Sequence, residues 1–235
     1  MNTVLLSGIV GSTAYGLARP DSDVDRLGVF AAPTTAVLGL DPVKESVVTT
    51  RPDSTMHEAG HYAGLLLGGN PSLTELLWLP EDLYETVTPL GEELIGVRGA
   101  FLCRRRVRDS YLGFARQQLG RINKALKNPA KLGNPAGAVA KSARHMARLL
   151  HQGRELYTTG QLTVRLDADT ATGIHEFGRG VAAGDTERAA ALLAEIDRAM
   201  PMGGGVLPTT PDKSRVQDWI LRVREAHWTP QEISA

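Results

Sequence analysis

A short stretch near the N-terminus constrains the fold more than any other part of the sequence. The apolar, β-branched run TVLLSGIVG at residues 3–11 predicts a strand that ends in a glycine. A second candidate strand, SDVDRLGVFAAP at residues 22–33, opens with Asp23 and Asp25. Because side chains alternate between the two faces of a strand, these two aspartates are expected to point the same way. The stretch therefore predicts a sheet that carries two carboxylates close to a glycine turn.

The rest of the chain divides into a mixed part and a helical part. ESVVTT (45–50) and STMHEA (54–59) are weaker strand patterns, and residues 61–79 predict two short helices separated at Asn70-Pro71. Helical spacing then dominates. Four helices are expected, over 101–126, 136–160, 185–200 and 213–228. The predicted architecture is an α/β (α+β) fold, with a small mixed-sheet domain at 1–98 followed by an α-helical domain at 99–235.

Charge is distributed unevenly along a chain whose formal net charge is zero. Residues 1–100 contain 5 Lys and Arg against 13 Asp and Glu, whereas residues 101–160 contain 13 against 2. An acidic first part suits cations and a basic middle suits polyanions. Basic solvated helix faces are also common, so charge alone leaves both interpretations open.

Composition bounds the class of protein. The only cysteine, Cys103, excludes an internal disulfide. The N-terminus lacks the pattern of a secretory signal, and no apolar run approaches the roughly 18 residues of a membrane span. We expect a cytoplasmic protein that does not bind membranes.

The aspartate pair and the glycine turn suggest one kind of chemistry when they are taken together. Carboxylate oxygens suit Mg²⁺ or Mn²⁺ better than zinc. Gly11 and Ser12 follow the first strand, where a tight turn can direct backbone N–H groups at an anion. Ser12 and Thr13 add hydroxyls, although either could serve only as a helix cap. A phosphate-binding turn beside a metal-binding pair is what metal-assisted attack on a nucleoside triphosphate requires.

The same residues resemble a known signature. A strand, Gly-Ser and then Asp-x-Asp is the pattern of the DNA polymerase β nucleotidyltransferase superfamily. GSTAYGLARPDSDVDRLGVF at 11–30 resembles a branch of predicted bacterial and phage nucleotidyltransferases, some of them associated with RNA repair. GNPSLTELLW at 69–78 and KSARHMARLLHQGRELYTTGQLTVRL at 141–166 extend the resemblance.

The resemblance implies an enzyme that moves a nucleoside monophosphate from an NTP to an acceptor hydroxyl and releases pyrophosphate. It implies two Mg²⁺ or Mn²⁺ ions held by Asp23, Asp25 and a third acid, which we place at Glu58 with Asp53 as the competitor. The expected acceptor is RNA, for example a tRNA 3′ end. His61 stands where related chains often have a lysine.

Further residues are candidates for substrate binding. Lys141, His145 and Arg148 are spaced i, i+4 and i+7 along one helical face, and the resemblance suggests that they reach the β- and γ-phosphates. Tyr15 is a candidate for stacking on a base or for a core position. The residues expected to hold the acceptor, or to be ordinary surface arginines, are Arg104, Arg105, Arg106 and Arg108.

Competing functions are also compatible with the sequence. A catalytically silent nucleotide- or RNA-binding module would not need Asp23 and Asp25. A toxin or antitoxin component that nucleotidylates a protein or a tRNA would need the same site. Aminoglycoside modification is disfavoured, because a cationic drug prefers an acidic groove to a basic one. A zinc site on His57 and His61 lacks a third ligand in the sequence.

Overall fold

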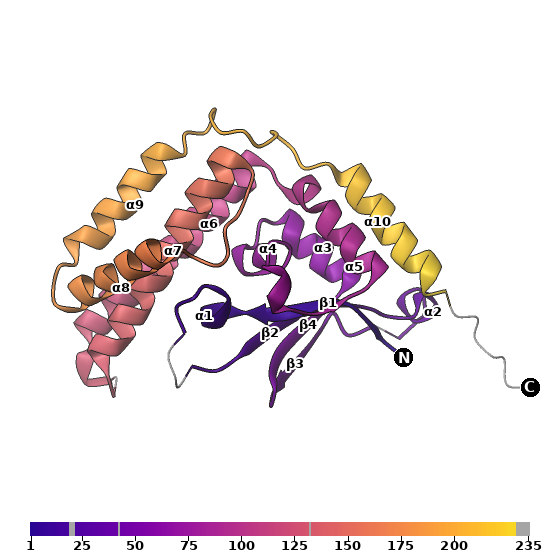
Figure 1. The fold of residues 1–235 in the computed structure, drawn as a ribbon, viewed down its shortest axis with the longest axis horizontal. Helices are drawn as coiled ribbons and strands as arrows, with labels where there is room; N and C mark the ends of the chain where they lie inside the picture. Colours follow the sequence, from indigo (N-terminus) through magenta and orange to yellow (C-terminus); the bar gives the residue numbers. More distant parts are fainter. Residues whose placement is uncertain (19–21, 42, 132, 229–235) are drawn as a thin grey trace, which may run out of the picture. The chain divides into compact units, whose positions relative to one another are not determined.

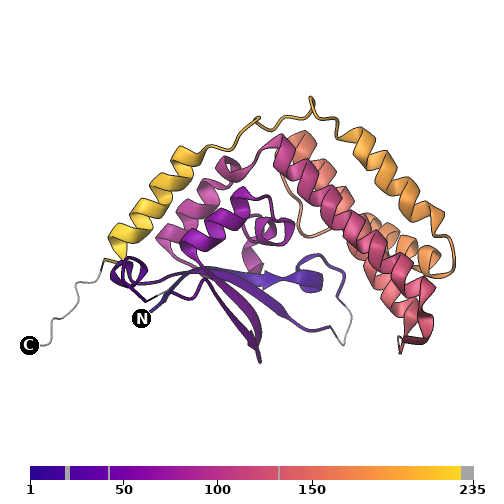
Figure 2. The same cartoon turned by 180° about the vertical axis from the view of Figure 1, so that it is seen from behind.

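The computed structural model describes residues 1–18, 22–41, 43–131 and 133–228 (Figures 1 and 2). The chain forms two compact units. Unit 1 consists of Met1–Leu102 and Pro211–Ala235, and unit 2 consists of Cys103–Thr210. In the described parts of the chain, no helix has the length and apolar character needed to cross a bilayer.

Unit 1 is built on a five-stranded mixed sheet, which confirms the predicted fold class. The strand order is β3-β4-β2-β1-β5; β2 and β4 run parallel, and the other neighbours are antiparallel. The four strands expected from the sequence are present, and the edge strand β5 was not predicted. The strands are β1 (Thr3–Val10), β2 (Asp25–Ala31), β3 (Ser46–Thr50), β4 (Asp53–Glu58) and β5 (Tyr84–Val87).

Short helices cover one face of this sheet, as the two opposite views in Figures 1 and 2 show. They are α3 (Ala59–Leu67), α4 (Pro71–Leu76) and α5 (Pro89–Gly96), and the chain also forms α1 (Gly11–Ala14), α2 (Thr34–Val37), η1 (Glu81–Leu83) and η2 (Arg98–Phe101). Asn70 caps α4 by accepting a hydrogen bond from the Ser72 amide, and Pro71 occupies the first helical turn. Leu6 of β1, Val29 of β2 and Tyr62 of α3 are fully buried. The core thus lies between the sheet and one helical layer.

The last helix, α10 (Lys213–Ala226), belongs to unit 1. Its apolar stripe of Val216, Trp219 and Val223 is buried against α5, η2 and α3. The indole Nε1 of Trp219 donates a hydrogen bond to the carbonyl of Leu90 at 2.9 Å. The division of the chain therefore differs from the expected domains 1–98 and 99–235, because the chain returns to its first unit.

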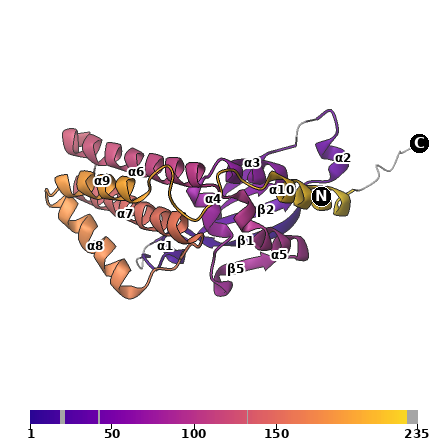
Figure 3. The same cartoon turned by 90° about the horizontal axis from the view of Figure 1, so that it is seen from above.

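Unit 2 consists of α6 (Arg104–Lys127), η3 (Pro129–Lys131), α7 (Pro135–Thr159), α8 (Ala168–Ala182) and α9 (Glu187–Ala199). Helices α6 and α7 lie side by side (Figure 3), and Gly153 allows the ring of Tyr111 to approach the backbone of α7 closely. Gly160, at φ 72°, ends α7 where the sequence predicted. Helix α8 was not predicted from the sequence.

Candidate active site

Two carboxylates lie level with each other on neighbouring strands. The parallel pairing matches Arg26 with Ser54 and Leu27 with Thr55. The preceding positions, Asp25 and Asp53, are therefore adjacent, because neighbouring strands are only about 4.8 Å apart. Asp25 opens β2 and Asp53 opens β4. The sheet thus brings together one acid of the predicted pair and Asp53, the predicted competitor for the third acid.

Asp23 precedes the strand instead of belonging to it. The prediction that both aspartates lie on one strand is corrected here, since β2 begins at Asp25 and residues 22–24 are irregular. Asp23 and Asp53 line one open hollow, together with Arg26 and the turn between β3 and β4. Asp25 and Asp53 line the neighbouring hollow. Asp53 therefore contributes to both.

Gly11 supports the carboxylate of Asp25. Its φ is 71°, in the left-handed region that strongly favours glycine. A Cβ placed on Gly11 would collide with Oδ2 of Asp25. Gly11 begins α1, and the amides of Tyr15 and Leu17 bond back to the carbonyls of Gly11 and Ser12 at 3.2 and 2.9 Å. The turn after β1 and the first acid of β2 are therefore in direct contact, and the contact depends on the glycine.

The hollow beside Asp25 has a volume of about 310 Å³ and is bounded by three kinds of wall. Strands β2 and β4 supply its floor, including Leu27, Thr55 and His57. Gly11 and Tyr15 come from the α1 turn, and α4 adds a third wall. The α4 residues that line the hollow are Ser72, Leu73 and Glu75. A hollow of this size, lined by acidic, hydroxyl-bearing and apolar residues, suits a small organic ligand that carries phosphates bound to cations.

The donor set of the site fits a hard divalent cation. Asp23, Asp25 and Asp53 offer only carboxylate oxygens, which Mg²⁺ and Mn²⁺ prefer. Across the described ranges, no three His, Cys, Asp or Glu side chains converge closely enough to hold an ion. The fold brings the three aspartates to two adjoining hollows but does not close them around one point.

Glu58 lies at the opposite end of β4 from Asp53. The residue is 6% exposed, and its side chain makes a double ion pair with Arg224 of α10, at 2.6 and 3.0 Å. It also caps α3 by accepting a hydrogen bond from the Gly60 amide at 2.7 Å. Burial raises the pKa of Glu58, but Arg224 and the amides of Gly60 and His61 outweigh that effect and lower it. The structure therefore does not bring Glu58 together with Asp23 and Asp25.

Two histidines follow the acids along the chain. His57 lines the hollow, and its Nδ1 lies 2.7 Å from the hydroxyl of Ser46 on β3. The ring of His61 is 5.7 Å from that of His57, and its Nδ1 is 3.4 Å from Glu45. Burial and the neighbouring His61 lower the pKa of His57. Among the residues that the structure describes, neither histidine belongs to a group of three side chains that could hold a metal ion.

Tyr15 is 9% exposed and anchors the wall of the hollow. Its hydroxyl donates a 2.5 Å hydrogen bond to Glu75, which is 1% exposed. The contact gives Tyr15 a structural partner, and stacking on a base stays a prediction. Glu75 was not singled out from the sequence. An acid on the apolar face of the predicted second helix was the available signal, since buried carboxylates need partners.

The three predicted phosphate-binding residues lie on α7, and their burial increases along the helix. Lys141 is exposed, His145 is half-buried, and Arg148 is 1% exposed. Burial lowers the pKa of His145 to about 4, and the charges of Arg148, Arg121 and Lys141 act in the same direction. Arg121, on α6, is a member of this cluster that sequence reasoning missed, because its position depends on how α6 and α7 pack.

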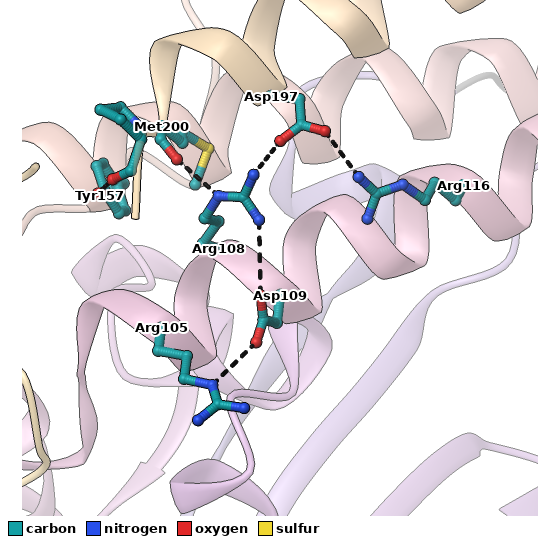
Figure 4. Close-up of polar contacts among 8 residues, drawn as sticks. Arg105, Arg108, Asp109, Arg116, Tyr157, Asp197 and Met200 are labelled. Atoms are coloured by element: carbon teal, nitrogen blue, oxygen red, sulfur yellow. Dashed lines mark hydrogen bonds and ion pairs between the residues drawn. The ribbon is translucent and has the colours of Figure 1, made fainter. Parts of the chain in front are cut away.

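Two of the four arginines at the start of α6 hold other parts of unit 2, and Figure 4 shows the contacts of one of them, Arg108. Arg108 Nε donates to the carbonyl of Met200 at 2.7 Å, and its guanidinium pairs with Asp197 of α9. Arg104 Nε donates to the carbonyl of Leu207 at 3.1 Å. These contacts tie the segment after α9 to α6.

The other two arginines face solvent. Arg105 is 75% exposed in its side chain and lies 3.5 Å from Asp109 on the next helical turn (Figure 4). Arg106 is exposed as well. Of the predicted acceptor-binding residues, Arg105 and Arg106 are those with side chains accessible to a nucleic acid.

Comparison with known proteins identifies the family of the chain. A search of curated protein sequences gives no match. The family model RlaP, described as the RNA repair pathway DNA polymerase beta family, matches residues 2–175 and so covers the sheet, α6, α7 and part of α8. The chain therefore belongs to the RNA repair pathway DNA polymerase beta family, a family of DNA polymerase β-type nucleotidyltransferases associated with RNA repair.

Proposed function

We propose that the protein is a metal-dependent nucleotidyltransferase that transfers a nucleoside monophosphate from an NTP to a hydroxyl group of RNA. The acceptor oxygen forms a bond to the α-phosphorus, and the bond between that phosphorus and the leaving oxygen breaks. Pyrophosphate leaves, and the hydroxyl proton passes to a carboxylate or to solvent. A tRNA 3′ end is an acceptor of the required chemistry.

The observation that carries this proposal is the position of Asp25. It lies against the left-handed turn at Gly11 on one side and level with Asp53 on the other. A phosphate held by the turn would therefore sit next to carboxylates. This juxtaposition is what transfer from a metal-bound triphosphate needs.

We assign the metal-binding role to Asp23, Asp25 and Asp53. When bound there, two Mg²⁺ or Mn²⁺ ions would neutralise the charge that develops on the phosphoryl oxygens. Asp53 replaces Glu58 in this assignment, because Asp53 lines both hollows and Glu58 is engaged by Arg224. The metal ions that these carboxylates would bind would also orient the acceptor oxygen.

The residues of the α1 turn are assigned to the triphosphate. Gly11, Ser12 and Thr13 present backbone N–H groups and two hydroxyls directly after β1. Tyr15, which ends this turn, is anchored by its hydrogen bond to Glu75. Lys141, His145 and Arg148 of unit 2 are assigned to phosphate binding on the basis of their charge and clustering.

The RNA acceptor is supported by the charge of unit 2. Residues 103–210 contain 17 Lys and Arg against 9 Asp and Glu, a net charge of +8. A surface of this sign favours a polyanion and makes its binding depend on salt. Arg105 and Arg106 are assigned to the acceptor backbone.

The test is incubation with each of four labelled NTPs and Mg²⁺, against total RNA and total protein. We expect label in RNA and release of pyrophosphate for the wild type, and a loss of at least about a thousandfold for Asp25→Asn. A matched control is Asp169→Asn, an exposed acid in the first turn of α8. Label in protein alone would replace RNA by a protein acceptor, and the absence of any transfer would leave a nucleotide-binding module.

A further inference from the structure

Unit 2 holds four basic side chains whose charges meet at His145, and the proposed function uses three of them. Arg121 comes from α6, and Lys141, His145 and Arg148 come from α7. The charges of the other three all act on His145. Arg121 and Lys141 are exposed, so a ligand can reach the group from solvent.

Arg148 supplies a fixed charge beneath this group. It is 1% exposed, and its Nη1 donates to Oε1 of Gln152 at 2.5 Å. Gln152 is itself held, because its Nε2 donates to the carbonyl of Thr163 at 3.1 Å. A guanidinium held in this way keeps its proton and its position. The positive charge of Arg148 therefore stays fixed in position next to His145.

The contact between Arg148 and His145 indicates how the imidazole is protonated. Nη2 of Arg148 lies 3.4 Å from Nδ1 of His145. An arginine nitrogen only donates, so Nδ1 acts as the acceptor and the ring carries its single proton on Nε2. Burial and the three surrounding cations favour the same neutral form and lower the pKa of His145 to about 4. An anion placed among these groups would reverse the effect of the cations.

The remaining faces of α7 are occupied by packing within unit 2. Helix α8 meets α7 at Arg144, whose side chain lies against Gly178. Two charged groups of α9 are engaged elsewhere, since Asp197 pairs with arginines of α6 and Arg188 lies over the ring of Phe177. The groups that act on His145 are thus those of α6 and of α7 itself.

We propose that Arg121, Lys141, His145 and Arg148 bind a terminal phosphate, and that His145 takes up a proton from solvent when this phosphate binds. A compact group with one buried member suits a multiply charged phosphate end better than a phosphodiester chain, which needs an extended row of cations. Such an end is present on an NTP and on a phosphorylated RNA terminus. The inference rests on the proposed role of α7 in phosphate binding, and it adds Arg121 and the uptake of a proton by His145.

The experiment is calorimetric titration of the full chain with inorganic pyrophosphate, with divalent ions chelated, in two buffers of different ionisation enthalpy at pH 7. The wild type should take up about half a proton or more per site beyond the uptake of His145→Gln. Arg121→Ala and Lys141→Ala should each weaken binding about tenfold. Arg179→Ala, which removes an exposed arginine of α8, should bind like the wild type. Equal proton uptake by the wild type and His145→Gln would overturn the proposal, as would binding that Arg121→Ala and Lys141→Ala leave unchanged.

Two ligand pairs identify the source of the phosphate. Tighter binding of ATP than of AMP assigns the site to the nucleotide. Tighter binding of 5′-phosphorylated than of hydroxyl-ended RNA assigns it to the RNA end, and equal binding within both pairs contradicts the proposal. Failure of the proposed function is recognised separately, because it appears as absent nucleotidyl transfer by the wild type while pyrophosphate still binds.

Discussion

Gly11 lies so close to Asp25 that a single methyl group on the glycine would overlap the carboxylate oxygen Oδ2 of the aspartate. The contact joins the turn after β1 to the first residue of β2. The two are also neighbours across the antiparallel pair β1–β2, in which Val10 is opposite Asp25. This contact comes from the pairing of the two strands and not from closeness in the sequence. The glycine is therefore needed for its backbone conformation and for the space that it leaves.

The first prediction concerns Gly11→Ala. The substitution forces an L-residue to keep a φ of 71° and pushes the carboxylate of Asp25 away, so we expect at least about a hundredfold loss of transfer and about 1–2 kcal/mol of stability. The measurements are labelled-NTP transfer and urea unfolding.

Gly160→Ala is the matched control for backbone strain. Gly160 has a φ of 72° at the end of α7, and a Cβ there would meet only Val206 and Leu207, at 3.7 and 3.8 Å. It should cost similar stability and leave transfer within about twofold of the wild type. If both variants lose transfer equally, strain alone explains Gly11 and the contact with Asp25 has no special role.

The second prediction separates the two candidates for the third acid. Asp53→Asn should abolish transfer and leave stability within about 0.5 kcal/mol, because Asp53 is exposed. Glu58→Gln should retain transfer at temperatures where it is folded, since Glu58 contacts Arg224 at the far end of β4. Both variants are assayed under conditions in which circular dichroism shows a folded chain. A folded Glu58→Gln without activity, beside an active Asp53→Asn, would restore Glu58 as the metal ligand.

This pair of residues shows what the sequence could and could not predict. The strand pattern at 53–58 and the presence of two acids in it are readable from the sequence. The choice between them depends on the parallel register of β2 and β4, which sets Asp25 level with Asp53. It also depends on α10, which returns from the end of the chain to bind Glu58. Both are long-range relationships that local periodicity does not contain.

The helices show the same division. Asn70-Pro71 and Gly160 mark helix ends through local backbone chemistry, and both predictions are confirmed. Helix α8 was missed although Ile174, Phe177 and Val181 form its buried stripe. Its several glycines weaken the propensity, and packing against α7 overrides that weakness.

The third prediction concerns stability and pH. The lowered pKa of Glu58 means that its ion pair with Arg224 contributes fully above the ordinary carboxyl value of 4.5 and is lost as the pH falls through the folded value. At pH 7, Glu58→Gln should destabilise unit 1 by about 2–4 kcal/mol, because it leaves the largely buried Arg224 without a charged partner. The difference between the wild type and Glu58→Gln should shrink between pH 5 and pH 3, since protonated glutamate resembles glutamine.

The control for this effect is a second ion pair on the same helix. Arg222 of α10 and Glu93 of α5 are 2.6 Å apart, but both side chains are more than 40% exposed. Glu93→Gln should therefore cost less than about 1 kcal/mol at every pH. Urea unfolding from pH 7 to pH 3 measures both variants. A constant difference for Glu58→Gln over this range would mean that its carboxylate is not what binds α10.

The fourth prediction distinguishes structural from nucleic-acid-binding arginines on α6. Arg108 contacts Met200 and Asp197 within unit 2, whereas Arg106 is exposed (Figure 4 shows the contacts of Arg108). Arg108→Ala should destabilise unit 2 by about 2 kcal/mol, because it removes a charge-assisted hydrogen bond and leaves Asp197 with Arg116 alone.

Arg106→Ala should leave stability within about 0.5 kcal/mol. It should also weaken RNA binding and lower the slope of log affinity against log salt by about 0.7–0.9, the value for one phosphate contact. Thermal unfolding and filter binding at several salt concentrations measure the two effects. RNA binding whose salt slope is the same for Arg106→Ala and the wild type would remove Arg106 from the acceptor site.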